Sequence, residues 1–167
     1  LIATPINKEK IDRLLKTPEV LAVIPGNIQF AWSQEQKAQE GTYFVMYILK
    51  KEAELTGKVI EDARADIDPI SNRPRVTMGM NSEGANEWSR ITGANINKRC
   101  AIVLDGVVYS APVINGKITG GNSEITGMPN IQEAKLMEIV LRAGSLPAPL
   151  KVIEERSIGP SLGEDSI

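Results

Sequence analysis

Hydrophobic and polar positions alternate along several short stretches of the chain, and each such stretch predicts an extended strand. Ile28, Phe30 and Trp32 alternate with polar or small residues, as in a strand with one buried face. The run 43–49 is continuously apolar and rich in aromatic and β-branched residues, which predicts a more buried strand. Because the polar stretch 33–41 lies between them, we expect the two strands to pair through a loop.

A helical pattern precedes these strands. Ile11, Leu14 and Leu15 recur at the spacing that places them on one face of a helix. We expect Asn7 to cap the start of this helix, because an Asn side chain can accept a hydrogen bond from a free N–H of the first turn. Pro18 is expected to end the helix, since the residue before a proline is biased away from helical geometry.

The second half of the chain alternates between strand and helix patterns. Strands are predicted at 75–80, 99–104, 107–114 and 150–153, with extended stretches at 59–67 and near Ile125. Helices are predicted after Asn81 or Ser82 and after Asn130, which are capping residues. The pair Asp105-Gly106 predicts a type I′ hairpin turn. The order of residues 75–156 is therefore βαββαβ, which predicts an α+β fold with a ferredoxin-like core and an antiparallel sheet, extended or covered by the N-terminal helix and strand pair.

Composition then excludes several classes of function. The 167 residues contain no histidine, a single cysteine, 19 Lys and Arg and 21 Asp and Glu, so the formal charge is −2. The absence of histidine excludes Ser-His-Asp catalysis and His-ligated metal sites, and one cysteine cannot form an internal disulfide. The charge balance argues against a nucleic-acid partner. We expect no catalytic residues, no metal and no cofactor.

Two features with possible chemistry have plainer interpretations. Glu61, Asp62, Asp66 and Asp68 could bind a divalent cation, but they lack the EF-hand spacing, and a solvated strand edge is the favoured interpretation. Cys100 could be a reactive thiol, but a buried small hydrophobic residue is favoured, because no activating basic group is evident.

One row of apolar residues is a candidate binding surface. Val76, Met78 and Met80 share one face of the strand predicted at 75–80. Methionine side chains are flexible and adapt to many apolar partners, so this row could contact polypeptide. Ordinary filling of the core is the alternative that we favour for the row.

Two long motifs near the end of the chain resemble a known family. Residues 141–149, Leu-Arg-Ala-Gly-Ser-Leu-Pro-Ala-Pro, and 154–163, Glu-Glu-Arg-Ser-Ile-Gly-Pro-Ser-Leu-Gly, resemble the segment before the second membrane helix of the SecD protein-export family, which includes fused SecDF chains. Upstream, Leu55-Thr56-Gly57 and Ile125-Thr126-Gly127 resemble the two Thr-Gly landmarks around the extracytoplasmic head of that family.

The resemblance implies a role in protein export. It implies the first extracytoplasmic (periplasmic) domain of a protein of the inner membrane, an auxiliary of the Sec translocon that is driven by the proton-motive force. The implied partners are the unfolded translocating polypeptide, the Sec translocon channel and SecF, separate or fused. The motif Gly159, Pro160, Ser161, Leu162 and Gly163 is implied to turn the chain into the membrane and to act as a hinge.

The domain organisation expected from these observations has three parts. Residues 1–53 form an N-terminal helix and strands, 54–157 form a head-type α+β domain, and 158–167 form the hinge. We expect the chain to be an extracytoplasmic domain excised from a longer protein. Two alternative functions remain open: a purely structural scaffold for partner subunits, and a small-molecule-binding domain on a ferredoxin-like fold.

Overall fold

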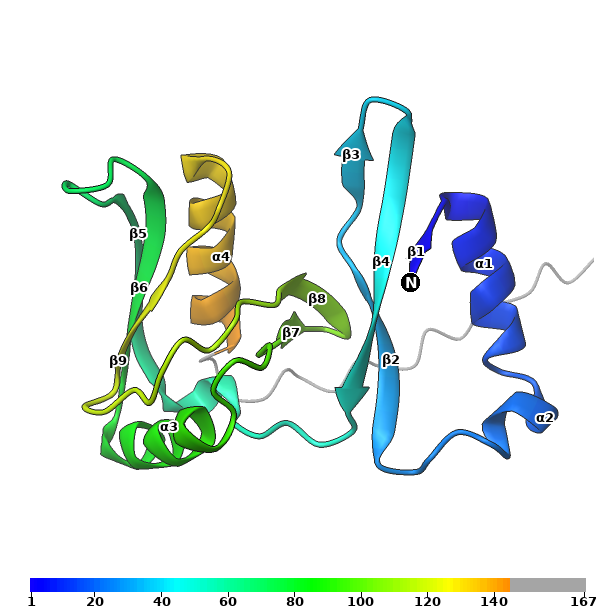
Figure 1. Ribbon diagram of the computed structural model, residues 1–167, viewed down its shortest axis with the longest axis horizontal. Helices are drawn as coiled ribbons and strands as arrows, with labels where there is room; N and C mark the ends of the chain where they lie inside the picture. The colour runs from blue at the N-terminus through cyan, green and yellow to red at the C-terminus, as the bar shows by residue number, and fades with distance from the viewer. Residues whose placement is uncertain (145–167) are drawn as a thin grey trace, which may run out of the picture.

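The computed structural model describes residues 1–144 and contains two β-sheets that lie side by side (Figure 1). The strands of the larger sheet are β1 (Ile2–Ala3), β2 (Ile28–Ser33), β3 (Gln36–Ala38), β4 (Gly41–Lys50), β7 (Ile102–Leu104) and β8 (Val107–Ser110). The strands of the smaller sheet are β5 (Ile60–Ile67), β6 (Pro74–Met80) and β9 (Asn122–Ile125). The helices are α1 (Pro5–Leu14), α2 (Pro18–Leu21), the 3-10 turn η1 (Gly57–Val59), α3 (Ser82–Ala94) and α4 (Ile131–Gly144).

The larger sheet joins the two halves of the chain. Its order is β1-β4-β2-β8-β7, with β3 paired to β4, and the predicted pairing of the two N-terminal strands is confirmed by the antiparallel register of β2 on β4. Strand β8 lies parallel to β2, with Trp32 opposite Val107. Helix α1 packs against this sheet, where the indole N–H of Trp32 donates a 2.7 Å hydrogen bond to Asp12.

Four N-terminal predictions need correction. Helix α1 begins at Pro5 with Thr4 at the N-cap position, so Asn7 lies inside the helix. Pro18 does not end a helix but begins α2, because proline at the first helical position has no N–H to satisfy. The expected loop 33–41 contains strand β3. Strand β4 is less buried than predicted, with Ile48 67% exposed.

The smaller sheet supplies the core around which the second half folds. It is antiparallel, in the order β5-β6-β9, and α4 packs on β5 and β6 (Figure 1). Alternation along the strands turns one side of each toward α4. The buried cluster consists of Ala63, Val76, Met78, Ile125, Ala134, Met137 and Leu141.

The α+β class is confirmed, but the ferredoxin-like order is not. That order would place the strand predicted at 107–114 beside the strand predicted at 75–80 in one sheet. Instead, β8 and β7 join β2 in the larger sheet, and β6 is flanked by β5 and β9. The physical reason is local: β5 and β6 are joined by a short turn at 68–73, so β5 occupies one edge of β6, and the stretch at Asn122–Ile125 occupies the other.

Several local predictions are confirmed. Asn81 caps α3, and its side chain accepts a 2.8 Å hydrogen bond from Gly84. Asp105 and Gly106 both have positive φ, at 51° and 76°, as a type I′ turn requires. The Asn130 side chain accepts a hydrogen bond from the N–H of Glu133 at the start of α4. The strands on either side of the turn at 105–106 are shorter than predicted, since β8 ends two residues before Pro112.

Two predictions lie outside the described residues: the strand at 150–153 and the hinge motif at 159–163. The division at residue 53 stays a prediction, and the β2–β8 pairing crosses it. Within residues 1–144, none of the helices combines the length and apolar character that crossing a membrane requires.

Candidate functional site

An apolar cavity of about 490 Å³ lies between the smaller sheet and the segment that carries β7. Its walls come from both sheets, from both long helices of the second half and from the loop 112–118. Its apolar lining includes Ile60, Met78, Met80, Trp88, Ile102 and Leu141. A cavity of this size and lining suits an apolar ligand or an apolar part of a larger one.

Two of the three residues of the candidate row on β6 line this cavity. Val76 is fully buried in the core and is not part of the cavity wall. Met78 is 8% exposed and Met80 is half-buried, and both line the cavity. The two methionines point the same way because they are two residues apart on one strand.

Trp88 joins α3 to the cavity wall. Its indole N–H donates a 2.7 Å hydrogen bond to the hydroxyl of Ser123 on β9. Satisfying the only polar atom of the indole leaves its ring as apolar surface, and the ring lines the cavity. The bond also fixes β9 against α3.

The loop after β8 forms a further wall and is anchored at several points. Ile114 donates a 2.9 Å main-chain hydrogen bond to Lys98, and Ile118 donates a 3.0 Å hydrogen bond to the hydroxyl of Thr92. Thr92 is completely buried on α3. The loop is therefore held at both ends, with Gly116 on the cavity wall between them.

Cys100 also lines the cavity. It is half-buried, and burial is the main cause that raises the pKa of its thiol, with the charge of Glu54 adding to it. The thiol is therefore neutral at pH 7 and behaves as apolar lining, in agreement with the favoured interpretation from the sequence.

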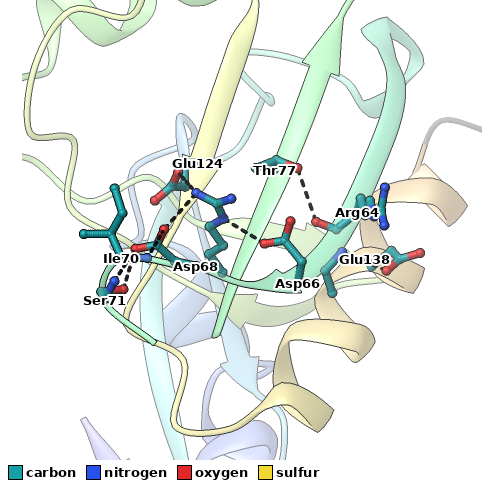
Figure 2. Close-up of polar contacts among 10 residues, drawn as sticks. Arg64, Asp66, Asp68, Ile70, Ser71, Thr77, Glu124 and Glu138 are labelled. Carbon is teal, nitrogen blue, oxygen red and sulfur yellow. Dashed lines mark hydrogen bonds and ion pairs between the residues drawn. The ribbon is translucent and has the colours of Figure 1, made fainter. Parts of the chain in front are cut away.

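The outer face of the smaller sheet, turned away from α4, is charged (Figure 2). Arg75 on β6 lies among three carboxylates: its Nε is 2.7 Å from Asp66, and its Nη1 is 3.3 Å from both Asp68 and Glu124. Hydrogen bonds from Ser71 hold the pKa of Asp68 below its ordinary value, and the charge of Arg75 acts in the same direction. These contacts tie β5, the turn after it, β6 and β9 together.

The acidic run accordingly has a structural role in the described chain. Asp66 and Asp68 are neutralised by Arg75, and Asp62 lies 3.5 Å from Arg142. Among residues 1–144, no group of three or more Asp, Glu or Cys side chains is arranged to hold a metal ion.

The sequence predicted only part of this site. Met78 and Met80 were identified from their alternation, whereas Ile102 and the loop 112–118 were missed as cavity residues. No local signal marks them, because they reach the cavity wall through contacts with residues distant in the sequence, such as the bond from Ile118 to Thr92.

The comparisons with known proteins all indicate the same family. The family model described as "SecDF, P1 head subdomain" matches residues 31–148. Protein translocase subunit SecD of Rhodothermus marinus is 48% identical over the whole chain, and subunit SecDF of Thermus thermophilus is 52% identical over 68% of it. The chain spans only 27% and 15% of these two relatives. A crystal structure of SecDF from Thermus thermophilus, described as a translocon-associated membrane protein, has 29% identity and a TM-score of 0.54, covering 89% of this chain and 22% of that one.

Proposed function

Because the chain belongs to the SecD/SecDF family of protein translocase subunits, of which it contains the P1 head subdomain, we propose that it binds polypeptide segments in transit during protein export. The binding site in this proposal is the apolar cavity lined by Met78 and Met80. The parent protein is proposed to be an inner-membrane auxiliary driven by the proton-motive force, with this domain on the periplasmic side. Its proposed partners are the Sec channel and SecF. Family membership is the support for these wider roles.

The observation that carries the proposal is the chemistry of the cavity lining. A protein that assists export meets chains of many sequences, so its binding site has to accept varied side chains. Met78 and Met80 are unbranched and flexible, and they adapt their shape to the side chain that enters. The apolar rings and branched side chains around them, Trp88 and Ile102 among them, contribute burial without requiring a particular hydrogen-bond pattern.

We propose that the domain acts by binding and release and not by catalysis. A site that gains its affinity from burial of a few apolar side chains binds weakly, because ordering the bound segment opposes the gain. Weak binding suits a chain that has to move on after each contact.

Cys100 offers a direct test, because it lines the cavity and is the only cysteine in the chain. The experiment measures the rate at which a maleimide labels Cys100, at fixed pH, with and without a short unfolded peptide of alternating Val and Ser. We expect the peptide to slow labelling in a saturable manner. A matched peptide with Asp in place of Val should leave the rate unchanged, since burying unpaired carboxylates is costly.

The result also separates this function from its alternatives. A structural scaffold predicts that neither peptide slows labelling at about 1 mM, a concentration that would fill even a weak site. That outcome would reject polypeptide binding in the cavity.

A further inference from the structure

The two edges of the smaller sheet differ in whether other parts of the molecule bond to their main chain. At the β5 edge, the main-chain N–H of Ala65 donates a 2.8 Å hydrogen bond to the carboxylate of Glu138, and the carbonyl of Ala63 accepts a 2.9 Å bond from the guanidinium of Arg142. Both side chains come from α4. This edge is therefore occupied, which prevents another strand from pairing there.

The β9 edge is open among the described residues. The N–H of Met80 donates a 2.9 Å bond to the carbonyl of Gly121, and the antiparallel register continues with Met78 opposite Ser123. Since hydrogen-bonding groups alternate between the two sides of a strand, those of Asn122 and Glu124 point away from β6. β9 is the last strand of its sheet in residues 1–144, and no described main chain pairs with this outer side.

The open edge borders the cavity. Ser123 and Ile125 are buried on the same face of β9, and both line the cavity wall. Helix α4 packs on β5 and β6, and Leu141 of α4 lines the same cavity as Ser123 and Ile125. Any strand added along β9 would turn every second side chain toward the cavity and the others toward the charged outer face.

Contacts on both faces of β9 hold the strand in an extended conformation. Trp88 fixes Ser123 from α3, and Arg75 holds the Glu124 side chain at 3.3 Å on the outer face. A strand that is already ordered loses little conformational entropy when a partner pairs with it.

We infer that the bound polypeptide segment pairs as an added strand with the open edge of β9, and that its alternate apolar side chains enter the cavity. This inference rests on the proposed function and names its binding mode. The main chain of the segment supplies hydrogen bonds that every sequence can make, and the cavity selects for apolar residues at every second position.

Substitution of Glu124 by proline tests the pairing from the protein side. E124P removes an N–H that points outward and makes no described bond within the sheet, so proline is compatible with the edge position. We expect E124P to bind the Val/Ser peptide about fivefold more weakly than E124A, the loss expected for one main-chain hydrogen bond, because both variants lose the contact with Arg75 and only E124A keeps the N–H. I67P, which places proline at the far end of the β5 edge, is the control and should bind the peptide as the unmodified chain does.

Two measurements on the unmodified 167-residue chain keep the inference testable if E124P fails to fold. Peptide binding should slow amide hydrogen exchange at Asn122 and Glu124 and leave Ala65, already bonded to Glu138, unchanged. Two peptides, each N-methylated on one of the two alternate sets of residues, should also differ in affinity. Only one of the two sets has N–H groups that face β9.

The outcomes separate the inference from the function on which it rests. Suppose that the peptide protects Cys100, but that binding does not slow amide exchange at Glu124 and N-methylation of the peptide does not alter its affinity. Strand addition is then wrong, and cavity binding stands. If no peptide protects Cys100, the proposed function fails and the inference fails with it.

Discussion

The carboxylate of Glu138 on α4 accepts a 2.8 Å hydrogen bond from the main-chain N–H of Ala65 on the edge strand β5. A side chain thus takes the place that a neighbouring strand would occupy. The same carboxylate lies 3.4 Å from Arg142, which bonds the carbonyl of Ala63 on the same edge. The helix therefore closes one edge of the smaller sheet and leaves the other, β9, as the place where pairing can occur.

Removing the Glu138 carboxylate should reopen this edge. We expect E138A to lower the free energy of unfolding by about 1–3 kcal/mol, because the N–H of Ala65 loses its partner. It should also promote self-association through β5. E138Q retains an acceptor oxygen and should lose less on both counts. Urea unfolding and light scattering measure the two effects, and an E138A chain as stable and as monomeric as E138Q would contradict this role.

Gly57 should not tolerate a side chain. A Cβ atom at Gly57 would overlap the carbonyl oxygen of Gly144 at the end of α4, and neither backbone can yield easily. We expect G57A to cost about 1–3 kcal/mol of stability through overpacking. Gly26, whose Cβ would meet nothing within 4 Å, is the control, and G26A should be close to neutral. Equal melting temperatures for the two variants would refute the contact.

Thr92 should control the loop that walls the cavity. Its hydroxyl donates a 2.7 Å bond to the carbonyl of Trp88 and accepts a 3.0 Å bond from the N–H of Ile118. T92V keeps the shape but leaves that N–H unpaired, which should cost about 1–3 kcal/mol and speed amide exchange at Ile118. T92S keeps the hydroxyl and should preserve slow exchange. Unchanged exchange at Ile118 in T92V would show that the loop is held in another way.

Asp12 should make stability depend on pH at the acid end. Partial burial alone raises the pKa of Asp12, but hydrogen bonds from Trp32 and Lys8 outweigh it, so the pKa is lowered overall. A lowered pKa in the folded state means that the carboxylate stabilises the fold above its unfolded pKa and that this contribution is lost as pH falls through the folded pKa.

The test compares unfolding free energies between about pH 5 and pH 2 for the unmodified chain and D12N. D12N should be less stable at pH 5, and its stability should fall less on acidification. A D12N profile parallel to that of the unmodified chain would contradict the assignment.

Features set by neighbouring residues could be predicted from the sequence. The Asp105-Gly106 turn, the Asn81 cap and the alternating strands depend on geometry within a few residues, and the structure contains all of them. The helix start at Pro5 could not be told from a start at Asn7, because Asn7 also has the chemistry of a cap.

Strand partners could not be predicted in the same way. Alternation states which face of a strand is buried but not which strand lies beside it. The stretch 107–114 fitted a place beside β6 as well as its actual place beside β2. The wall opposite Met78 and Met80 comes from segments distant in the sequence, Ile102 and the loop 112–118, so alternation along one strand identified the two methionines but not that wall.

The central claim is that polypeptide occupies the cavity, and site-specific crosslinking inside the full-length translocase subunit tests it most directly. A photoreactive residue replaces Met80, which lines the cavity, or Arg64, which is exposed on the outer face of β5. An exported chain is stalled in transit, and the crosslinked product is measured. We expect crosslinks from position 80 and none from position 64. Equal crosslinking from both positions, or none from position 80, would contradict it.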